Sequence, residues 1–215
     1  MTVTNLRAKH KRLRVSQVLD AADALFAERG YEATRIEEIA ESASVAPATI
    51  YNYFATKPNL LMELALRHVH VALPARRAFL RNLPADPVQG IEGFERLLST
   101  QALRHLSREC WRAIMAQFIE PGGRAGRTGA RLNTLIKRQY VQMFRTYQER
   151  GRIRSDVDPV ALSDLIVGIT TMDFGRFISG SGGTIEDLLQ MGVPHIRLIL
   201  AGVVVEPARR RKAQP

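Results

Sequence analysis

Helical spacing of apolar residues is the feature that most constrains what this chain can fold into. Apolar side chains recur three and four positions apart along nearly its whole length, and no segment shows the strict alternation of a half-buried strand. The first stripe ends at Gly30, a residue type that commonly stops a helix, and it comprises Val15, Val18, Leu19, Ala22, Leu25 and Phe26. The pattern predicts an all-α protein.

Proline and glycine divide the chain into three short helices followed by longer ones. The longer helices are expected at about 58–81, 87–105, 107–119, 127–150, 158–178 and 184–203. We therefore expect a small N-terminal domain over 15–62 and a larger helical domain over 63–205. A flexible basic arm is expected over 1–14, and a basic disordered tail over 206–215.

The composition excludes several classes of protein. Of the 215 residues, 46% are hydrophobic, which is enough for a buried core. The single cysteine, Cys110, rules out an internal disulfide and a thiolate-rich zinc site, and it indicates a reducing compartment. No apolar run reaches the roughly 18 residues that a membrane helix needs, and the N-terminus lacks an apolar signal core. We expect a cytoplasmic protein that does not enter a membrane.

No motif of catalysis or cofactor binding stands out. The five histidines have no metal-ligand spacing, and there is neither a nucleophile elbow nor a paired-carboxylate motif. The glycine-rich segments 121–129 and 179–183 are interpreted as helix connectors, because the first lacks the Gly-Lys-Ser/Thr ending of a phosphate loop. We expect no metal, no cofactor and no catalytic residue. An enzyme and a helical protein-binding module are kept as alternatives.

The formal net charge of +10 favours a polyanionic partner. Basic residues cluster at 7–14 and 208–212, close to the two ends of the chain. A basic run in such a place is either an arm that contacts nucleic acid or a solvated tail.

Two short helices joined by a tight turn are predicted within 34–56. Thr34, with Glu37 three residues later, predicts a capping box at the start of the first of them. Pro47 suits the first turn of the second, where a missing N–H is tolerated. In that second helix Ile50 and Phe54 share one face, which we expect to be buried.

The opposite face of the helix that begins at Pro47 is small and polar. Ala48 and Asn52 point away from the buried face, Tyr51 lies on one flank, and Thr49 and Tyr53 lie toward the other. An amide that can pair with a base edge and phenols that reach phosphates suit a helix in a DNA major groove. The pattern favours a helix-turn-helix, and the alternative is a small helical subdomain whose surface happens to be polar.

Residues 12–62 resemble the N-terminal domain of TetR-family transcriptional regulators. The resemblance is carried by VLDAADALFAERGYEATRIEEIAESASVAPATIYNYFATKPNLL, with its helix, Gly-aromatic turn, Thr-capped helix and Thr-aliphatic-Tyr-x-aromatic-Phe-x-x-Lys ending. The remainder matches only in helix layout and in RGRIRSDVDP, residues 150–159. The resemblance implies a DNA-binding head followed by a ligand-binding and dimerisation domain.

The resemblance also assigns roles in the head. It implies that double-stranded operator DNA is contacted by Thr34, Arg35, Pro47, Ala48, Thr49, Tyr51, Asn52, Tyr53 and Lys57. Ser44 stands where the family usually has a turn glycine, and Ala46 where it usually has a capping hydroxyl. Loss of that cap costs about 1 kcal/mol locally, and Ser44 is a candidate substitute acceptor. The basic arm 7–14 is expected to enter the adjacent minor groove.

A dimer is expected, because one helix-turn-helix grips DNA weakly and two are normally spaced near one helical turn, about 34 Å. The last two helices are the candidates for the interface, and Pro194 is expected to kink the second of them. The interface residues proposed from the sequence are Leu165, Gly168, Ile169, Gly175, Leu188, Ile196 and Ile199. Periodicity cannot distinguish an interface from an intramolecular core, so the latter is the alternative.

Bulky side chains between the head and the last helices are candidates for an apolar ligand cavity. The residues proposed to line it are Arg104, Trp111, Met115, Phe118, Tyr140, Met143, Phe144, Asp173 and Arg176. Each of them is alternatively a core residue, and Asp173 with Arg176 is alternatively a structural ion pair.

The function expected from these features and from the resemblance is that of a ligand-responsive transcriptional regulator. The specific hypothesis is a homodimeric repressor whose two heads become wrongly spaced for the operator when a small, largely apolar effector binds. A regulator that activates, or that needs its ligand in order to repress, is the alternative within the same class.

Overall fold

The computed structural model describes residues 3–119 and 124–205, and within them it contains nine helices and no extended strand. Most boundaries lie within three residues of the expected ones, so the all-α prediction is confirmed. None of the described helices is both long and apolar enough to cross a membrane. The helices are α1 (Val3–Arg29), α2 (Ile36–Ser42), α3 (Pro47–Phe54), α4 (Lys57–Arg81), α5 (Pro87–His105), α6 (Arg108–Ile119), α7 (Arg124–Glu149), α8 (Pro159–Ser179) and α9 (Ile185–Ala201).

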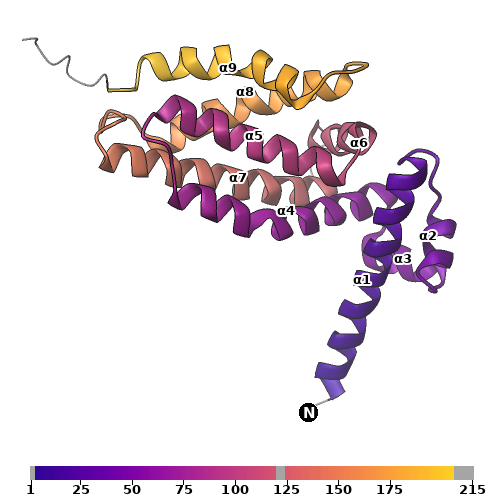
Figure 1. Cartoon of the computed structure of the whole chain (residues 1–215). Coiled ribbons are helices and arrows are strands. Elements are labelled where there is room, and N and C mark those ends of the chain that lie inside the picture. Colours follow the sequence, from indigo (N-terminus) through magenta and orange to yellow (C-terminus); the bar gives the residue numbers. More distant parts are fainter. Residues whose placement is uncertain (1–2, 120–123, 206–215) are drawn as a thin grey trace, which may run out of the picture.

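Helices α1, α2 and α3 form a small head at one end of an elongated bundle (Figure 1). The core of the head is apolar and includes Val18, Phe26, Ile39, Ile50 and Phe54. The N-terminal half of α1 projects away from the bundle, and the basic segment 7–14 lies within it (Figure 1). The arm that was expected to be flexible is therefore helical over these residues. Nothing in 7–14 breaks a helix, because Lys, Arg, Ala and Leu are all good helix formers. The tail 206–215 lies outside the described residues.

The start of α2 differs from the sequence prediction. Arg35, not Thr34, is the N-cap residue, and its N–H donates to Glu38 Oε2 at 2.7 Å. The Thr34 side chain is 1% exposed, and its hydroxyl donates to the carbonyl of Gly30 at 2.7 Å. The hydroxyl thus closes the turn after α1 instead of capping α2. The prediction of a capping box formed by Thr34 and Glu37 was therefore wrong, because the observed N-cap and N3 residues are Arg35 and Glu38.

Helix α4 belongs to both the head and the bundle. Its first half contributes Leu60, Leu61, Leu64 and Val69 to the core of the head, and that core continues into α6 and α7. The domain boundary expected at residue 62 therefore falls inside a continuous helix. A rigid helix shared by two domains can transmit a displacement from one to the other.

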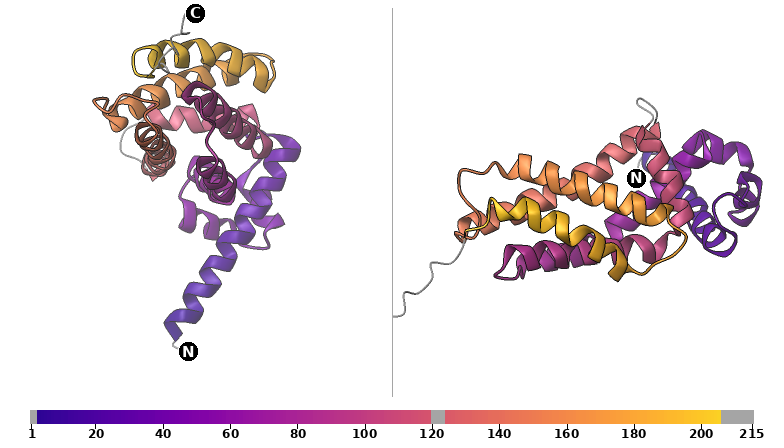
Figure 2. Two further views of the ribbon diagram at one scale, coloured as in Figure 1. Left: turned by 60° about the vertical axis from the view of Figure 1, so that its left-hand side comes forward. Right: turned by 90° about the horizontal axis from the view of Figure 1, so that it is seen from above.

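The bundle is layered, with α8 and α9 forming its outer layer on the side away from the head (Figure 1). Seen from above, α8 and α9 run side by side along the long axis of the bundle (Figure 2). The core beneath them contains Phe94 of α5 with Tyr140, Phe144 and Tyr147 of α7. Pro194 lies inside α9, which is one helix from Ile185 to Ala201.

Candidate functional site

The exposed face of α3 has the composition expected of a recognition helix. Ile50 and Phe54 are buried against the head, whereas Ala48 and Asn52 on the opposite side are exposed. The Tyr51 side chain is 48% exposed, so its hydroxyl is free to reach a phosphate. Helix α3 thus presents a small residue, an amide and a phenol together.

Two of the predicted phosphate contacts are held in place by neighbouring aromatic rings. Lys57 Nζ lies 4.2 Å from the ring centroid of Tyr31 and donates to the carbonyl of Glu32 at 3.3 Å. Tyr53 is half-buried and meets Phe54 edge-on, with ring centroids 6.4 Å apart. A positioned ammonium at the start of α4 is preorganised for an anion, since a helix N-terminus also offers free N–H groups.

The remaining predicted DNA contacts have mixed environments. Pro47 is exposed and Thr49 is half-buried on α3, while exposed Arg35 forms an ion pair with Glu37 at 3.5 Å. The Thr34 side chain faces the interior and has both hydrogen bonds of its hydroxyl directed at backbone carbonyls. Its hydroxyl cannot contact DNA, so Thr34 is removed from the candidate contacts.

The turn into α3 carries local strain and no cap. Ser44, in the place of the usual glycine, has φ 52°, a left-handed conformation that costs a non-glycine residue about 1 kcal/mol. Ala46 is the N-cap residue of α3 and makes no side-chain bond to it. Among the described residues, Ser44 does not act as the substitute acceptor. The helix is instead held by Pro47 in its first turn and by the burial of Ile50 and Phe54.

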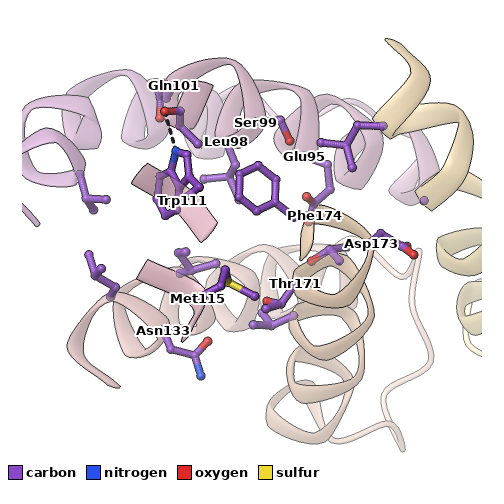
Figure 3. A pocket seen from close by; sticks show the side chains of 18 of the residues that line it. Glu95, Leu98, Ser99, Gln101, Trp111, Met115, Asn133, Thr171, Asp173 and Phe174 are labelled. Carbon is purple, nitrogen blue, oxygen red and sulfur yellow. Dashed lines mark hydrogen bonds between the residues drawn. The ribbon is translucent and has the colours of Figure 1, made fainter. Parts of the chain in front are cut away.

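A cavity of about 420 Å³ lies within the bundle, between α4, α5, α6, α7, α8 and α9. Trp111 and Met115 of α6 and Phe174 of α8 form one apolar wall (Figure 3). Trp111 and Phe174 meet edge-on with centroids 5.4 Å apart, and Trp111 Nε1 donates to the carbonyl of Ala102 at 3.0 Å. The ring orientation of Trp111 is thus fixed from both sides.

The polar groups of the cavity come from α4, α5, α7 and α8. Arg76 is buried, and its Nε donates to Gln101 Oε1 at 2.7 Å. The Glu95 carboxylate accepts from the Tyr140 hydroxyl. Burial raises the pKa of Glu95 to about 7, against the opposing effect of hydrogen bonds from Tyr140 and Thr170. The cavity can therefore meet both an apolar body and a polar group of a ligand.

Three of the nine ligand contacts predicted from the sequence line this cavity, namely Trp111, Met115 and Asp173. Three others, Tyr140, Met143 and Phe144, are fully buried in the core beside it, and Arg104 and Arg176 are exposed on the surface. The Phe118 side chain lies outside the described residues. Asp173 is 2% exposed, accepts from His195 Nδ1 at 2.8 Å and pairs with Arg176 Nη1 at 3.7 Å, which makes Arg176 a structural partner of Asp173.

Sequence reasoning missed His68, Arg76, Glu95 and Gln101, all of which line the cavity. Each lies on the apolar side of α4 or α5, where a polar residue interrupts the stripe. A polar residue within an apolar stripe could have identified these positions from the sequence, because a polar group on a buried face needs a partner or a ligand.

Some of the residues proposed for the dimer interface face the interior. Leu188 and Ile196 are buried, Ile199 packs against the bundle core, and Gly175 faces Met115, whose Cε would lie 3.5 Å from a Cβ at that position. Leu165 and Gly168 are exposed, and Ile169 is partly exposed. The outward-facing apolar residues of the outer layer are Val160, Leu165, Met172, Met191 and Leu198.

The cavity wall is bonded to the head at two points. His68 lines the cavity, stacks on His105 with centroids 4.5 Å apart, and lies 3.1 Å from Asp23 Oδ1 of α1. Burial alone would raise the pKa of Asp23, but the hydrogen bond from His68 and the charges of His68, Arg67 and His105 lower it. Asp23 is therefore a charged anchor of α1.

The second bond comes from α6, the helix that carries Trp111. Glu109 Oε1 accepts from the N–H of Glu32 at 2.6 Å, in the turn between α1 and α2. Gly30 has φ 85°, which favours glycine, and a Cβ there would lie 2.6 Å from Glu109 Oε2, so a larger residue would push the Glu109 carboxylate aside. A shift of α6 would therefore pull on the turn between α1 and α2 in the head.

A helix-turn-helix with an exposed polar recognition helix, attached to a helical domain with an internal cavity, defines the class of ligand-responsive DNA-binding regulators. Residues 18–64 match the family model of bacterial regulatory proteins of the tetR family. Residues 18–64 thus form a DNA-binding domain of this family, and the chain is a ligand-responsive DNA-binding transcriptional regulator, not an enzyme.

The relatives extend over most of the chain. The transcriptional regulator UidR of Escherichia coli is 24% identical over 160 residues, which is 72% of this chain and 76% of UidR. The transcriptional repressor KstR2 of Mycobacterium tuberculosis is 25% identical over 201 residues, 90% of this chain and 94% of KstR2. The structure of the TetR-family repressor FadR of Thermus thermophilus, in complex with lauroyl-CoA, has a TM-score of 0.74 at 20% identity, covering 91% of this chain and 97% of FadR.

Proposed function

We propose that the protein is a homodimeric repressor that binds operator DNA through two copies of α3 and is released by a small, largely apolar effector in the bundle cavity. The observation that carries this proposal is the bond between His68, which lines the cavity, and Asp23 in the head. A ligand that displaces His68 would break its contact with Asp23 and would thereby change how α1 is held against α4. KstR2 and FadR are both named repressors, and the FadR structure contains lauroyl-CoA. These two relatives support the proposal of a repressor that binds an apolar ligand.

The DNA surface proposed for this chain is α3 together with Arg35, the N-cap residue of α2, and Lys57, the first residue of α4. Ala48 and Asn52 would face base edges, with Pro47 and Thr49 beside them, while Tyr51, Tyr53, Lys57 and Arg35 would bind phosphates. The head has basic residues of α1 on one side, and Lys11 Nζ lies 5.8 Å from the ring centroid of Tyr53. The helical segment 7–14 would thus follow the DNA backbone next to α3.

The DNA surface predicts that phosphate contacts and base contacts respond differently to substitution. We expect Lys57→Ala to weaken binding to all DNA sequences and to lower the salt slope of log K by about 1. Asn52→Ala should instead relax base preference at one position, at a cost of about 1–3 kcal/mol on the preferred operator. Fluorescence anisotropy with DNA from upstream of the gene and with random DNA, over a range of salt, measures both.

Two outcomes would count against this DNA surface. One is an unliganded protein that binds the upstream fragment no better than random DNA. The other is an Asn52→Ala variant that loses affinity equally on every sequence, which would make Asn52 a backbone contact. Glu41→Gln, an exposed position at the end of α2, serves as the control for a general effect of surface charge.

The hydrogen bond from α6 to the head can be tested by substitution of Glu109. Glu109→Ala removes the acceptor of the Glu32 N–H, whereas Glu109→Gln keeps an oxygen in its place. For a compound that quenches Trp111 fluorescence, we expect the concentration needed to release DNA to rise about tenfold in Glu109→Ala and to change little in Glu109→Gln. The affinity of the compound itself, read from the quench, should stay within about twofold. Equal release by all three proteins would exclude α6 as a route of coupling.

The dimer is proposed to form through the outer layer of α8 and α9. The two helices are joined by a short connection and run side by side (Figure 2). Leu165 and Met172 of α8 and Met191 and Leu198 of α9 are exposed apolar side chains of this layer, which a partner molecule could cover.

A further inference from the structure

The guanidinium of Arg76 lines the cavity without an ion-pair partner among the described residues. Three carboxylates line it, and each has a partner of its own: Glu95 accepts from Tyr140, Asp164 pairs with Lys137 at 2.5 Å, and Asp173 pairs with His195 at 2.8 Å. The guanidinium of Arg76 also lines the cavity, and no carboxylate of the described residues lies within 4.0 Å of it. The Asp164 and Asp173 carboxylates thus have basic partners of their own, and the Arg76 guanidinium forms no ion pair with a described residue.

The environment of Arg76 makes the missing ion pair costly. The residue is 4% exposed, and among the described residues its Nη1 has no hydrogen-bond partner. Within the part of the chain that the structure describes, its one hydrogen bond runs from Nε to the neutral amide oxygen of Gln101. Burial lowers the pKa of Arg76 to about 10, so the group is still charged at neutral pH. Buried cations are normally paired, and a planar guanidinium with free N–H groups matches a carboxylate.

Most of the remaining cavity surface is apolar, although polar side chains such as Ser99, Asn133 and Thr171 also line it. Leu98, Trp111, Met115, Ile136 and Phe174 line it, and the cavity volume of about 420 Å³ suits a small organic molecule. The wall formed by Trp111 and Phe174 (Figure 3) provides contact area for a chain or ring, but offers few partners for a strongly hydrated group.

From this arrangement we infer that the effector is an apolar carboxylic acid whose carboxylate binds Arg76 and whose hydrocarbon part lies against the Trp111, Met115 and Phe174 wall. The inference rests on the proposed function in placing the effector in this cavity. It adds the chemical class of the ligand and assigns its headgroup to one side chain, which anchors the acid on α4, the helix shared with the head.

The chain contains one tryptophan, and it lies in the cavity wall, so Trp111 fluorescence reports cavity binding without DNA. The probes are decanoate and 4-phenylbutyrate, each compared with its neutral primary amide. With the wild-type protein we expect each acid to bind about tenfold or more tightly than its amide, as a charge-assisted hydrogen bond would give. Equal binding of acid and amide, or quenching by neither acid, would overturn the inference.

Arg76→Gln provides the second measurement, and Arg77→Gln is its matched control because Arg77 is the adjacent but exposed residue. We expect Arg76→Gln to lose the preference for the acid about tenfold and Arg77→Gln to retain it. Retained preference in Arg76→Gln would overturn the assignment to this residue. If the acids bind at Arg76 but do not release DNA, the proposed repressor mechanism fails while the ligand class stands; the comparison of wild-type acid and amide binding does not depend on the variant folding.

Discussion

Substitution of Leu165 and Leu198 by aspartate is expected to yield a monomer that binds operator DNA about 10²–10⁴-fold more weakly than the native protein. Both side chains lie on the outer layer, 60% and 77% exposed in the single chain, and neither contributes to the bundle core. Joining two weakly binding heads makes the second contact intramolecular, and the loss of that linkage gives a factor of this size. Sedimentation equilibrium reports the mass, and anisotropy on the upstream fragment reports the affinity.

The matched control for the interface variant is Val71→Asp, at an apolar side chain of α4 that is 68% exposed but lies outside the α8 and α9 layer. It should leave both mass and DNA affinity unchanged. A Leu165→Asp, Leu198→Asp protein that is still dimeric would place the interface elsewhere. A monomer that binds the operator with native affinity would contradict the proposed requirement for two heads.

The interface also illustrates what the sequence could and could not predict. Leu165, Leu188, Ile196 and Leu198 all belong to strongly apolar helices, yet the first and last face outward and the middle two face the core. A helix that is apolar on several sides has no single stripe, so its periodicity cannot say which side meets its own chain and which is left open. That distinction required the placement of α5 and α7 beneath the outer layer.

The exposed face of the recognition helix α3 could be predicted from the sequence, because it depends only on residues within that helix. Ile50 and Phe54 are four residues apart on a short helix, and burying them fixes the outward direction of Ala48 and Asn52. Helix boundaries were predictable for the same reason, since proline and glycine act on their own neighbours. Thr34 was misplaced because two competing acceptors, the carbonyls of Gly30 and Leu25, come from the preceding helix and its turn.

The cavity was predictable only in part. Large side chains on α6 such as Trp111 suggested apolar volume, but those on α7 such as Tyr140 and Phe144 fill the core beside the cavity instead. Which bulky residues enclose a space depends on how six helices pack, and no single-helix pattern records that. Arg76 and Glu95 become meaningful only when α4 and α5 are placed side by side.

Glu95 leads to the last prediction, a dependence of stability on pH. Its pKa is raised from 4.5 to about 7, chiefly by burial, and its remaining exposed surface faces the cavity. Below about pH 4.5 the carboxyl is protonated in both the folded and the unfolded chain, so it contributes nothing. As the pH rises toward 7 the unfolded chain releases the proton first, and the folded protein loses up to about 3 kcal/mol of stability, a loss that is complete above pH 7.

Glu95→Gln keeps an oxygen acceptor for the Tyr140 hydroxyl but has no proton to release. We therefore expect it to be more stable than the native protein by up to about 3 kcal/mol near pH 8 and equal to it near pH 4.5. Urea unfolding at a series of pH values, with Glu149→Gln at the exposed end of α7 as control, measures the difference. A gain from Glu95→Gln that is the same at every pH would mean that packing, and not the buried charge, accounts for it. A loss of stability near pH 8 would mean that the carboxylate is better solvated by Tyr140 and Thr170 than its burial implies.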